Sequence, residues 1–240
     1  MKISQPMIPG RLVRRYKRFL ADVELDDGRL ITASTPNTGS MMGLLDEGNR
    51  VWLSVSDDPR RKYAHRWEMV EVEGPAGLVM VGINTSLPNG LAAEALAAGL
   101  IPGFAGFSNI RREVRYGEEN SRIDLLVEYE DEPPLYVEVK NVTLSRAPGV
   151  AEFPDAVSAR GAKHLRELAR MVKSGKGRAA MIYLAQREDA ERLAVAADID
   201  PAYMEEWQRA REAGVEMHAL ACRVSPEEIS ARRAIPVTHR

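Results

Sequence analysis

Two carboxylates and one lysine lie on two neighbouring segments that have the pattern of β-strands. Asp124 belongs to the segment 122–129, and Glu138 and Lys140 belong to the segment 135–144. Side chains two residues apart in a strand share a face, so Glu138 and Lys140 point the same way. Carboxylates held close together favour a counter-cation. Mg²⁺ is held by one or two carboxylates, oxygen and water and acts on phosphates, so the pattern predicts a metal-assisted phosphodiester site.

An antiparallel strand pair with one solvated face would carry similar charges, and this alternative stays open. The metal site is favoured because the residues around Glu138 and Lys140 are otherwise apolar. Charges inside such a strand tend to be buried, and buried charges are paired or bind metal. We therefore predict Mg²⁺ or Mn²⁺ as cofactor, with Asp124, Glu138 and the Val139 carbonyl as ligands. Lys140 would orient the attacking water or stabilise the charge that develops on the phosphate.

The elements that must position these residues follow from the chain pattern. The turn at 130–134 contains two prolines between two apolar-alternating segments, which predicts a β-hairpin. A helix is expected over 90–99, with Asn89 as its N-cap, and a long helix over 155–173. Further strands are expected at 113–116, 179–185 and 215–222, with a last helix at 203–213. This order predicts an α/β domain with a central mixed sheet over residues 83–240.

The first 82 residues have a different character. Short strands are expected at 19–25, 29–33, 50–56, 67–72 and 78–83, with little helix. Five short strands within about eighty residues predict an OB-like β-barrel, with a β-sandwich as the alternative. The fold class is therefore mixed α and β, with a barrel before an α/β domain.

Cations interleaved with aromatic residues occur twice in this barrel. A single-strand or RNA-binding surface uses such cations on phosphates and such aromatics on bases. The other interpretation is a solvated face. The candidate residues are Arg14, Arg15, Lys17 and Arg18 in one run and Arg60, Arg61 and Lys62 in the other. In the α/β domain, Arg122 precedes the strand of Asp124, and Arg160 and His164 lie one helical turn apart, facing either the metal site or solvent.

Composition restricts the class of protein. The 240 residues are 45% hydrophobic and 28% charged, with a net charge of -2, so any site for a polyanion must be local. One cysteine, Cys222, excludes an intramolecular disulfide and fits a cytoplasmic protein. No apolar run approaches the ~20 residues that cross a bilayer, so no membrane partner is expected. The oligomeric state stays open, and a homodimer is one possibility.

Several blocks in fixed order resemble the sugar fermentation stimulation protein A family. They are the segments 14–22, 36–39 (Pro-Asn-Thr-Gly), 116–124, 137–140 (Val-Glu-Val-Lys), 153–157 (Phe-Pro-Asp-Ala-Val) and 164–168. The resemblance implies an OB-like domain followed by a domain of the PD-(D/E)XK nuclease-like superfamily, in a DNA-binding family with a regulatory link to sugar metabolism. It assigns Asp124 and Glu138 to the acidic pair, Lys140 to the lysine, and Glu94 to an acidic helix position beside the metal.

Three functions follow from these observations. The first is a divalent-metal-dependent nuclease acting on DNA. The second is a catalytically silent DNA-binding regulator linked to sugar metabolism genes. The third is a single-strand or RNA-binding module that uses the barrel. The sequence does not decide whether the DNA partner is single- or double-stranded.

Overall fold

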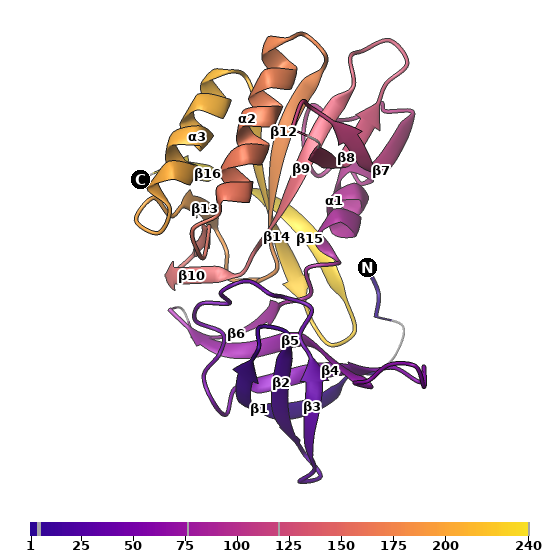
Figure 1. Cartoon of the computed structure of the whole chain (residues 1–240), viewed down its shortest axis with the longest axis vertical. Coiled ribbons are helices and arrows are strands. Elements are labelled where there is room, and N and C mark those ends of the chain that lie inside the picture. The colour runs from indigo at the N-terminus through magenta and orange to yellow at the C-terminus, as the bar shows by residue number, and fades with distance from the viewer. Residues whose placement is uncertain (4–5, 76, 120, 240) are drawn as a thin grey trace.

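The computed structural model consists of an N-terminal barrel packed against a larger mixed α/β region (Figure 1). It describes residues 1–3, 6–75, 77–119 and 121–239. Three clusters of buried apolar side chains form the interior, one within the barrel and one on each face of the main sheet of the α/β region. None of the helices in the described part is long and apolar enough to cross a membrane.

The barrel closes through five strands in the order β1-β2-β3-β5-β4. The strands are β1 (Ile8–Tyr16), β2 (Leu20–Leu25), β3 (Leu30–Ser34), β4 (Arg50–Val55) and β5 (His65–Gly74). Neighbours are antiparallel, except that β3 meets β5 in parallel at Ser34 and Arg66 and so closes the barrel. This closure confirms the predicted OB-like barrel.

Two strands of this region differ from the expectation. β1 was not expected from the sequence. A register shift between Leu12 and Arg14 interrupts the alternation of apolar and polar residues, and three of its nine residues are arginines. The segment expected as the fifth barrel strand is β6 (Gly77–Gly82), which pairs with β5 outside the closed barrel. The amide of Gly82 donates to the Gln186 carbonyl (2.9 Å), so β6 leads from the barrel into the α/β region.

The α/β region contains a six-stranded sheet in the order β15-β14-β12-β9-β8-β7. β9, β12 and β14 are parallel to one another, whereas β7, β8 and β15 run antiparallel to their neighbours. The strands are β7 (Asn109–Tyr116), β8 (Ser121–Glu128), β9 (Leu135–Val142), β12 (Arg178–Ala185), β14 (Glu216–Val224) and β15 (Ile229–Ile235). The mixed sheet and the β8–β9 hairpin are therefore as predicted.

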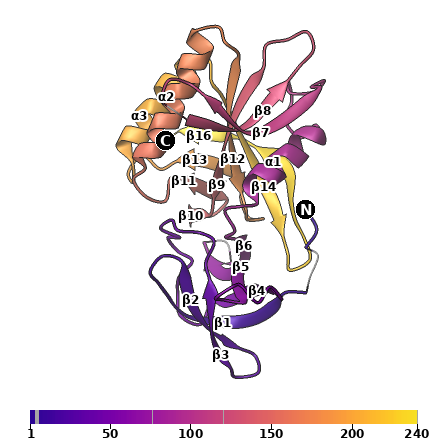
Figure 2. The same ribbon diagram turned by 45° about the vertical axis from the view of Figure 1, so that its right-hand side comes forward.

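Helices cover both faces of this sheet (Figure 2). α1 (Pro88–Ala97) packs on one face, and α2 (Ala159–Lys173) and α3 (Pro201–Glu212) pack on the other. α1 begins one residue before Asn89, so Asn89 is not the N-cap and its side chain is free for another role. α2 begins at Ala159, later than expected, with Ser158 as its N-cap.

A second, smaller sheet was not predicted. It has the order β10-β11-β13-β16, with strands β10 (Leu144–Ala147), β11 (Val150–Phe153), β13 (Arg192–Val195) and β16 (Val237–His239). Strands of three or four residues are too short to show a periodicity in the sequence. β15 was missed for another reason, since the polar residues of Ile-Ser-Ala-Arg-Arg-Ala-Ile hide its strand pattern.

The first residues of the chain pack on the α/β region. Lys2 forms a bridge with Glu228, and the amide of Ile3 donates to the carbonyl of Glu227 (2.9 Å). Contacts between the two regions therefore involve both ends of the barrel sequence. The division into domains at 82/83 stays a prediction.

Candidate active site

The site begins where β8 and β9 separate. The backbone ladder between them ends at Leu125 and Val137. The next amide of β9 that faces β8 belongs to Val139, and it donates to Oδ2 of Asp124 at 2.7 Å. The N–H and C=O of one strand residue point to the same side, so the Val139 carbonyl faces this gap as well. Asp124 and the backbone of Val139 are thus brought together, and their role as metal ligands stays a prediction.

The Asp124 carboxyl group is largely buried. Its Oδ1 accepts a hydrogen bond from Nδ2 of Asn89, in the first turn of α1, at 3.0 Å. Burial, followed by the negative charge of Glu138, raises the pKa of Asp124 to about 6, although the Val139 amide opposes the shift. The charge of Asp124 is therefore costly in the absence of a cation.

Glu138 lies on the α2 face of the sheet, with Lys140 and His164 around it. Lys140 Nζ donates to Glu138 Oε1 at 2.6 Å, and Nδ1 of His164 contacts the same oxygen. Arg160 donates to Nε2 of His164 (3.4 Å), which leaves the proton of a neutral ring on Nδ1, toward Glu138. Burial opposes ionisation of Glu138, which is 2% exposed, but Lys140 and His164 prevail and lower its pKa.

One oxygen of this glutamate has no partner. Oε2 of Glu138 is buried and accepts no hydrogen bond from the residues that the structure describes. A buried carboxylate oxygen without a donor is costly, and a cation would satisfy it. Two carboxylates, a backbone carbonyl and water fit Mg²⁺ or Mn²⁺. Within the described ranges no three His, Cys, Asp or Glu side chains are arranged to hold a metal ion.

A cavity of about 430 Å³ opens beside this cluster. Its charged lining contains four cations and one carboxylate, and it reaches His164, which contacts Glu138. The lining residues are Glu113, Arg115, Ser121, Arg122, Arg160, Lys163 and His164. A phosphate chain entering this cavity would meet positive charge before it reached Glu138. Arg122, Arg160 and His164 were predicted as nucleic-acid contacts, and the structure places all three here.

Glu113 and Asn89 are site residues that the sequence analysis missed. The β7–β8 register passes from Arg112 with Leu125 to Val114 with Ile123, so Glu113 is left opposite Asp124. Its φ is +54°, which is uncommon for a residue with a side chain. This backbone conformation departs from that of a regular strand, and here Asn89 Nδ2 lies 3.4 Å from Glu113 Oε1. In the sequence, the one feature that could have indicated this contact was an asparagine at the start of the expected helix.

Glu94 does not take the position that the resemblance implied. Its side chain pairs with the ammonium group of Met1 at 3.0 Å. That ammonium also donates to the carbonyl of Ile229, at the start of β15 (2.7 Å). β15 forms one edge of the sheet, whereas β8 with Asp124 lies next to β7 at the other edge. The prediction of Glu94 as a metal ligand is therefore corrected, and Asn89 is the α1 residue that contacts Asp124.

The first barrel run contains two arginines with structural contacts and two exposed cations. Arg15 donates to the carbonyls of Arg18 (2.7 Å), Asn37 (2.9 Å) and Gly39 (3.0 Å), so it stabilises a loop. Arg14 pairs with Asp22 at 2.8 Å. Lys17 and Arg18 are exposed in the β1–β2 turn. In this run, therefore, Lys17 and Arg18 are the cations best placed to meet a ligand.

The second barrel run lies in the β4–β5 loop. Arg60 forms a bidentate pair with Asp58 (3.0 Å for both bonds), and Lys62 lies over the ring of Tyr63. Arg61 is exposed. The local pairing of Arg60 reduces the charge that this loop offers to a phosphate.

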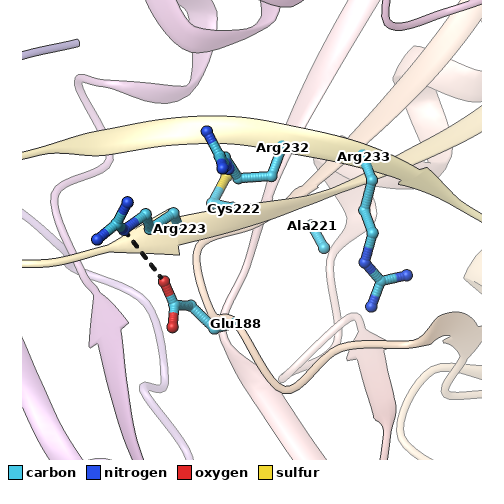
Figure 3. A pocket seen from close by; sticks show the side chains of 6 residues that line it. All are labelled: Glu188, Ala221, Cys222, Arg223, Arg232 and Arg233. Atoms are coloured by element: carbon cyan, nitrogen blue, oxygen red, sulfur yellow. Dashed lines mark ion pairs between the residues drawn. The ribbon is translucent and has the colours of Figure 1, made fainter.

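Another cavity, of about 440 Å³, lies on β14 and β15 (Figure 3). It is lined by Arg223, Arg232 and Arg233, with Glu188 as its acid. Arg223 lies 3.9 Å from Glu188, and Arg233 donates to the Ala190 carbonyl at 2.8 Å. Charges on an edge strand protect it from pairing with other chains, which explains Arg232 and Arg233 on β15 without a ligand, and Arg223 on β14 is close to Glu188.

A closed five-stranded barrel followed by a mixed sheet with helices on both faces defines a protein with an OB domain and an α/β domain. Family models match both parts. The model described as "SfsA N-terminal OB domain" matches residues 13–81, and "Sugar fermentation stimulation protein RE domain" matches residues 86–228. The chain belongs to the sugar fermentation stimulation protein family, as the sequence blocks indicated.

Individual relatives agree with this assignment. Sugar fermentation stimulation protein homologs of Brucella melitensis and Brucella ovis are each 52% identical over 237 residues, covering 99% of this chain and 97% of theirs. Among solved structures, Pyrococcus furiosus SfsA in complex with Ca²⁺ is similar, with a TM-score of 0.86 and 28% identity. That match covers 99% of this chain and 98% of the other.

Proposed function

We propose that this protein binds DNA and hydrolyses its phosphodiester bonds with the help of Mg²⁺ or Mn²⁺. The observation that carries the proposal is the free, buried Oε2 of Glu138 beside Asp124, whose pKa is raised to about 6. A relative of 28% identity is described in complex with Ca²⁺, which takes oxygen ligands as Mg²⁺ does.

The residues have separate roles in this proposal. Asp124, Glu138 and the Val139 carbonyl would hold the cation, which when bound polarises the scissile phosphate and lowers the pKa of a water molecule. Lys140 orients that water or stabilises the charge that develops on the phosphate. Asn89 holds the carboxylate of Asp124. The cations around the cavity bind phosphates next to the cleaved bond.

Nicking of supercoiled plasmid DNA in Mg²⁺ or Mn²⁺ tests the catalytic part of the proposal. We expect Asp124→Asn and Lys140→Met to abolish nicking, because they remove a cation ligand and the charge next to it. Lys173→Met, which removes an exposed charge in the last turn of α2, is the matched control and should nick like the wild type. Equal nicking by Asp124→Asn and the wild type would refute the proposal.

A second function is favoured by a specific contact. Glu138 Oε1 already accepts from Lys140 and contacts His164, so part of its charge is compensated without a metal. A catalytically silent DNA-binding regulator would use the same cavity only to hold DNA. In that case plasmid binding, measured by gel shift in Ca²⁺, would survive Asp124→Asn, and no metal would support nicking by the wild type.

A further inference from the structure

A loop of the barrel is fixed to the segment that leads into α2. The amide of Met41, in the loop between β3 and β4, donates to Oδ2 of Asp155 at 3.0 Å. The Thr85 hydroxyl donates to the carbonyl of Pro36 at 2.7 Å, which adds a second contact from the chain beyond β6. Arg15 holds the same loop from the barrel side through the carbonyls of Asn37 and Gly39. The Pro-Asn-Thr-Gly and Phe-Pro-Asp-Ala-Val blocks therefore meet at one junction.

Exposed apolar side chains gather on the segments that form this junction. Of the six large apolar side chains exposed within the described part of the chain, three lie here: Phe19 (51%), Met42 (42%) and Val157 (76%). The carbonyl of Phe19 accepts from the amide of Thr35 at 2.7 Å, at the start of the same loop. Met42 follows Met41, and Val157 lies two residues after Asp155. Each of the three therefore belongs to, or closely follows, a segment that is hydrogen-bonded at this junction, and exposed apolar side chains that share a region are typical of interaction surfaces.

Cations flank this apolar surface on both sides. Lys17 and Arg18 are exposed directly before Phe19, in the β1–β2 turn. Arg160 is exposed three residues after Val157 and lines the cavity that leads to Glu138. Exposed cations are thus present both on the barrel side of the junction and at the cavity of the candidate active site.

We propose that this junction binds a single strand of nucleic acid on its way to the active site. Phe19 stacks on an unpaired base, Met42 and Val157 contact neighbouring bases, and Lys17, Arg18 and Arg160 contact phosphates. The bases of a duplex are stacked and paired with one another, so their faces are not accessible to the three exposed apolar side chains. The inference rests on the proposed function for its nucleic-acid ligand and adds that the substrate contains an unpaired segment.

The second barrel run does not offer such a surface. Arg60 is paired with Asp58, and Lys62 covers the ring of its neighbour Tyr63. The 56–64 loop carries no large apolar side chain that is exposed. The path of the strand is therefore assigned to the β1–β2 turn and the loop after β3.

Fluorescence anisotropy with a labelled oligo-dT and with a duplex of the same length tests the inference, with Ca²⁺ in place of Mg²⁺. The variant Phe19→Ala/Met42→Ser/Val157→Ser should bind oligo-dT at least about fivefold more weakly, the low end of the effect of one lost stacking contact. Duplex binding should change by less than about twofold. The matched control is Leu30→Ser/Leu78→Ser, which removes two exposed apolar side chains (67% and 69%) from β3 and β6.

Unchanged oligo-dT binding, an equal loss for duplex, or an equal loss in the control variant would overturn the inference. Circular dichroism and the Tm of each variant establish that it is folded. The variant Asp124→Asn separates this inference from the proposed catalysis. If the wild type cleaves no DNA but oligo-dT binding requires Phe19, only the catalytic proposal fails. If cleavage requires Asp124 but oligo-dT binding is unchanged when the three apolar residues are replaced, only the junction proposal fails.

Discussion

The side-chain amide of Asn89 lies 3.0 Å from Oδ1 of Asp124 and 3.4 Å from Oε1 of Glu113. One residue of α1 thereby connects carboxylates on the neighbouring strands β7 and β8. An amide N–H donated to a carboxylate stabilises its ionised form. Asn89 therefore helps to keep Asp124 charged at a position where burial and Glu138 oppose the charge.

Replacing this amide should weaken cation binding. In Asn89→Ala the pKa of Asp124 rises further above about 6, because a hydrogen bond that lowers it is lost. We expect Mn²⁺ affinity at pH 6.5, measured by calorimetry, to fall by about three- to tenfold, equivalent to about 1 kcal/mol. Asn109→Ala, which removes an exposed donor to Glu128, should leave the affinity unchanged. Equal affinities for wild type and Asn89→Ala would contradict the assigned contact.

The raised pKa of Asp124 makes a prediction about stability and pH. A pKa of about 6 in the folded state, against about 3.9 when unfolded, means that the folded protein holds this proton more tightly. The free energy of unfolding should therefore decrease as pH rises from about 4 to about 6, by about 2–3 kcal/mol from this group alone. Asp124→Asn should lack this decrease and be the more stable protein at pH 7. Urea unfolding across this pH range measures both.

The control for this experiment is Glu94→Gln, which changes an exposed carboxylate on α1. Its pH profile should follow that of the wild type. Mg²⁺ should raise the Tm of the wild type at pH 7 but not that of Asp124→Asn. If the free energy of unfolding of the wild type increased between pH 4 and 6 as much as that of Asp124→Asn, the raised pKa of Asp124 would be refuted.

The buried pair of Glu138 and Lys140 should show strong coupling. Lys140→Met leaves a nearly fully buried carboxylate with His164 as its remaining neighbour, and we expect a loss of about 3 kcal/mol in the free energy of unfolding. Adding Glu138→Gln removes the uncompensated charge and should restore part of the loss. A double-mutant cycle by urea unfolding measures the coupling. Additive effects of the two substitutions would show that the pair is not formed.

The two neighbouring arginines of β1 should behave differently. Arg15 is half-buried and donates to several loop carbonyls, so Arg15→Ala should lower the free energy of unfolding by about 2 kcal/mol. Arg14 is exposed, and Asp22 keeps hydrogen bonds from Tyr16 and Thr32 when the arginine is removed, so Arg14→Ala should cost less than about 1 kcal/mol. Similar losses for both would contradict the structural role of Arg15.

Several features were readable from the sequence because they depend on local periodicity. The alternation in 122–129 and 135–144 predicts the β8–β9 hairpin, and a period of two places Glu138 and Lys140 on one face. The series of short strands predicts the barrel. The interrupted alternation of β1 hid a whole strand, because the register shift at Leu12 changes which side chains face inward.

The tertiary structure alone decided which side chains complete the site. His164 reaches Glu138 from α2, 26 residues away, and Asn89 reaches Asp124 from α1, 35 residues away. Glu94 shares α1 with Asn89 but pairs with Met1 instead. Spacing along the chain fixes only which residues share a face of their own element, whereas packing of helices on the sheet determines which of those faces meet. The sequence therefore determined the carboxylates and the lysine, and the fold determined the residues that hold them.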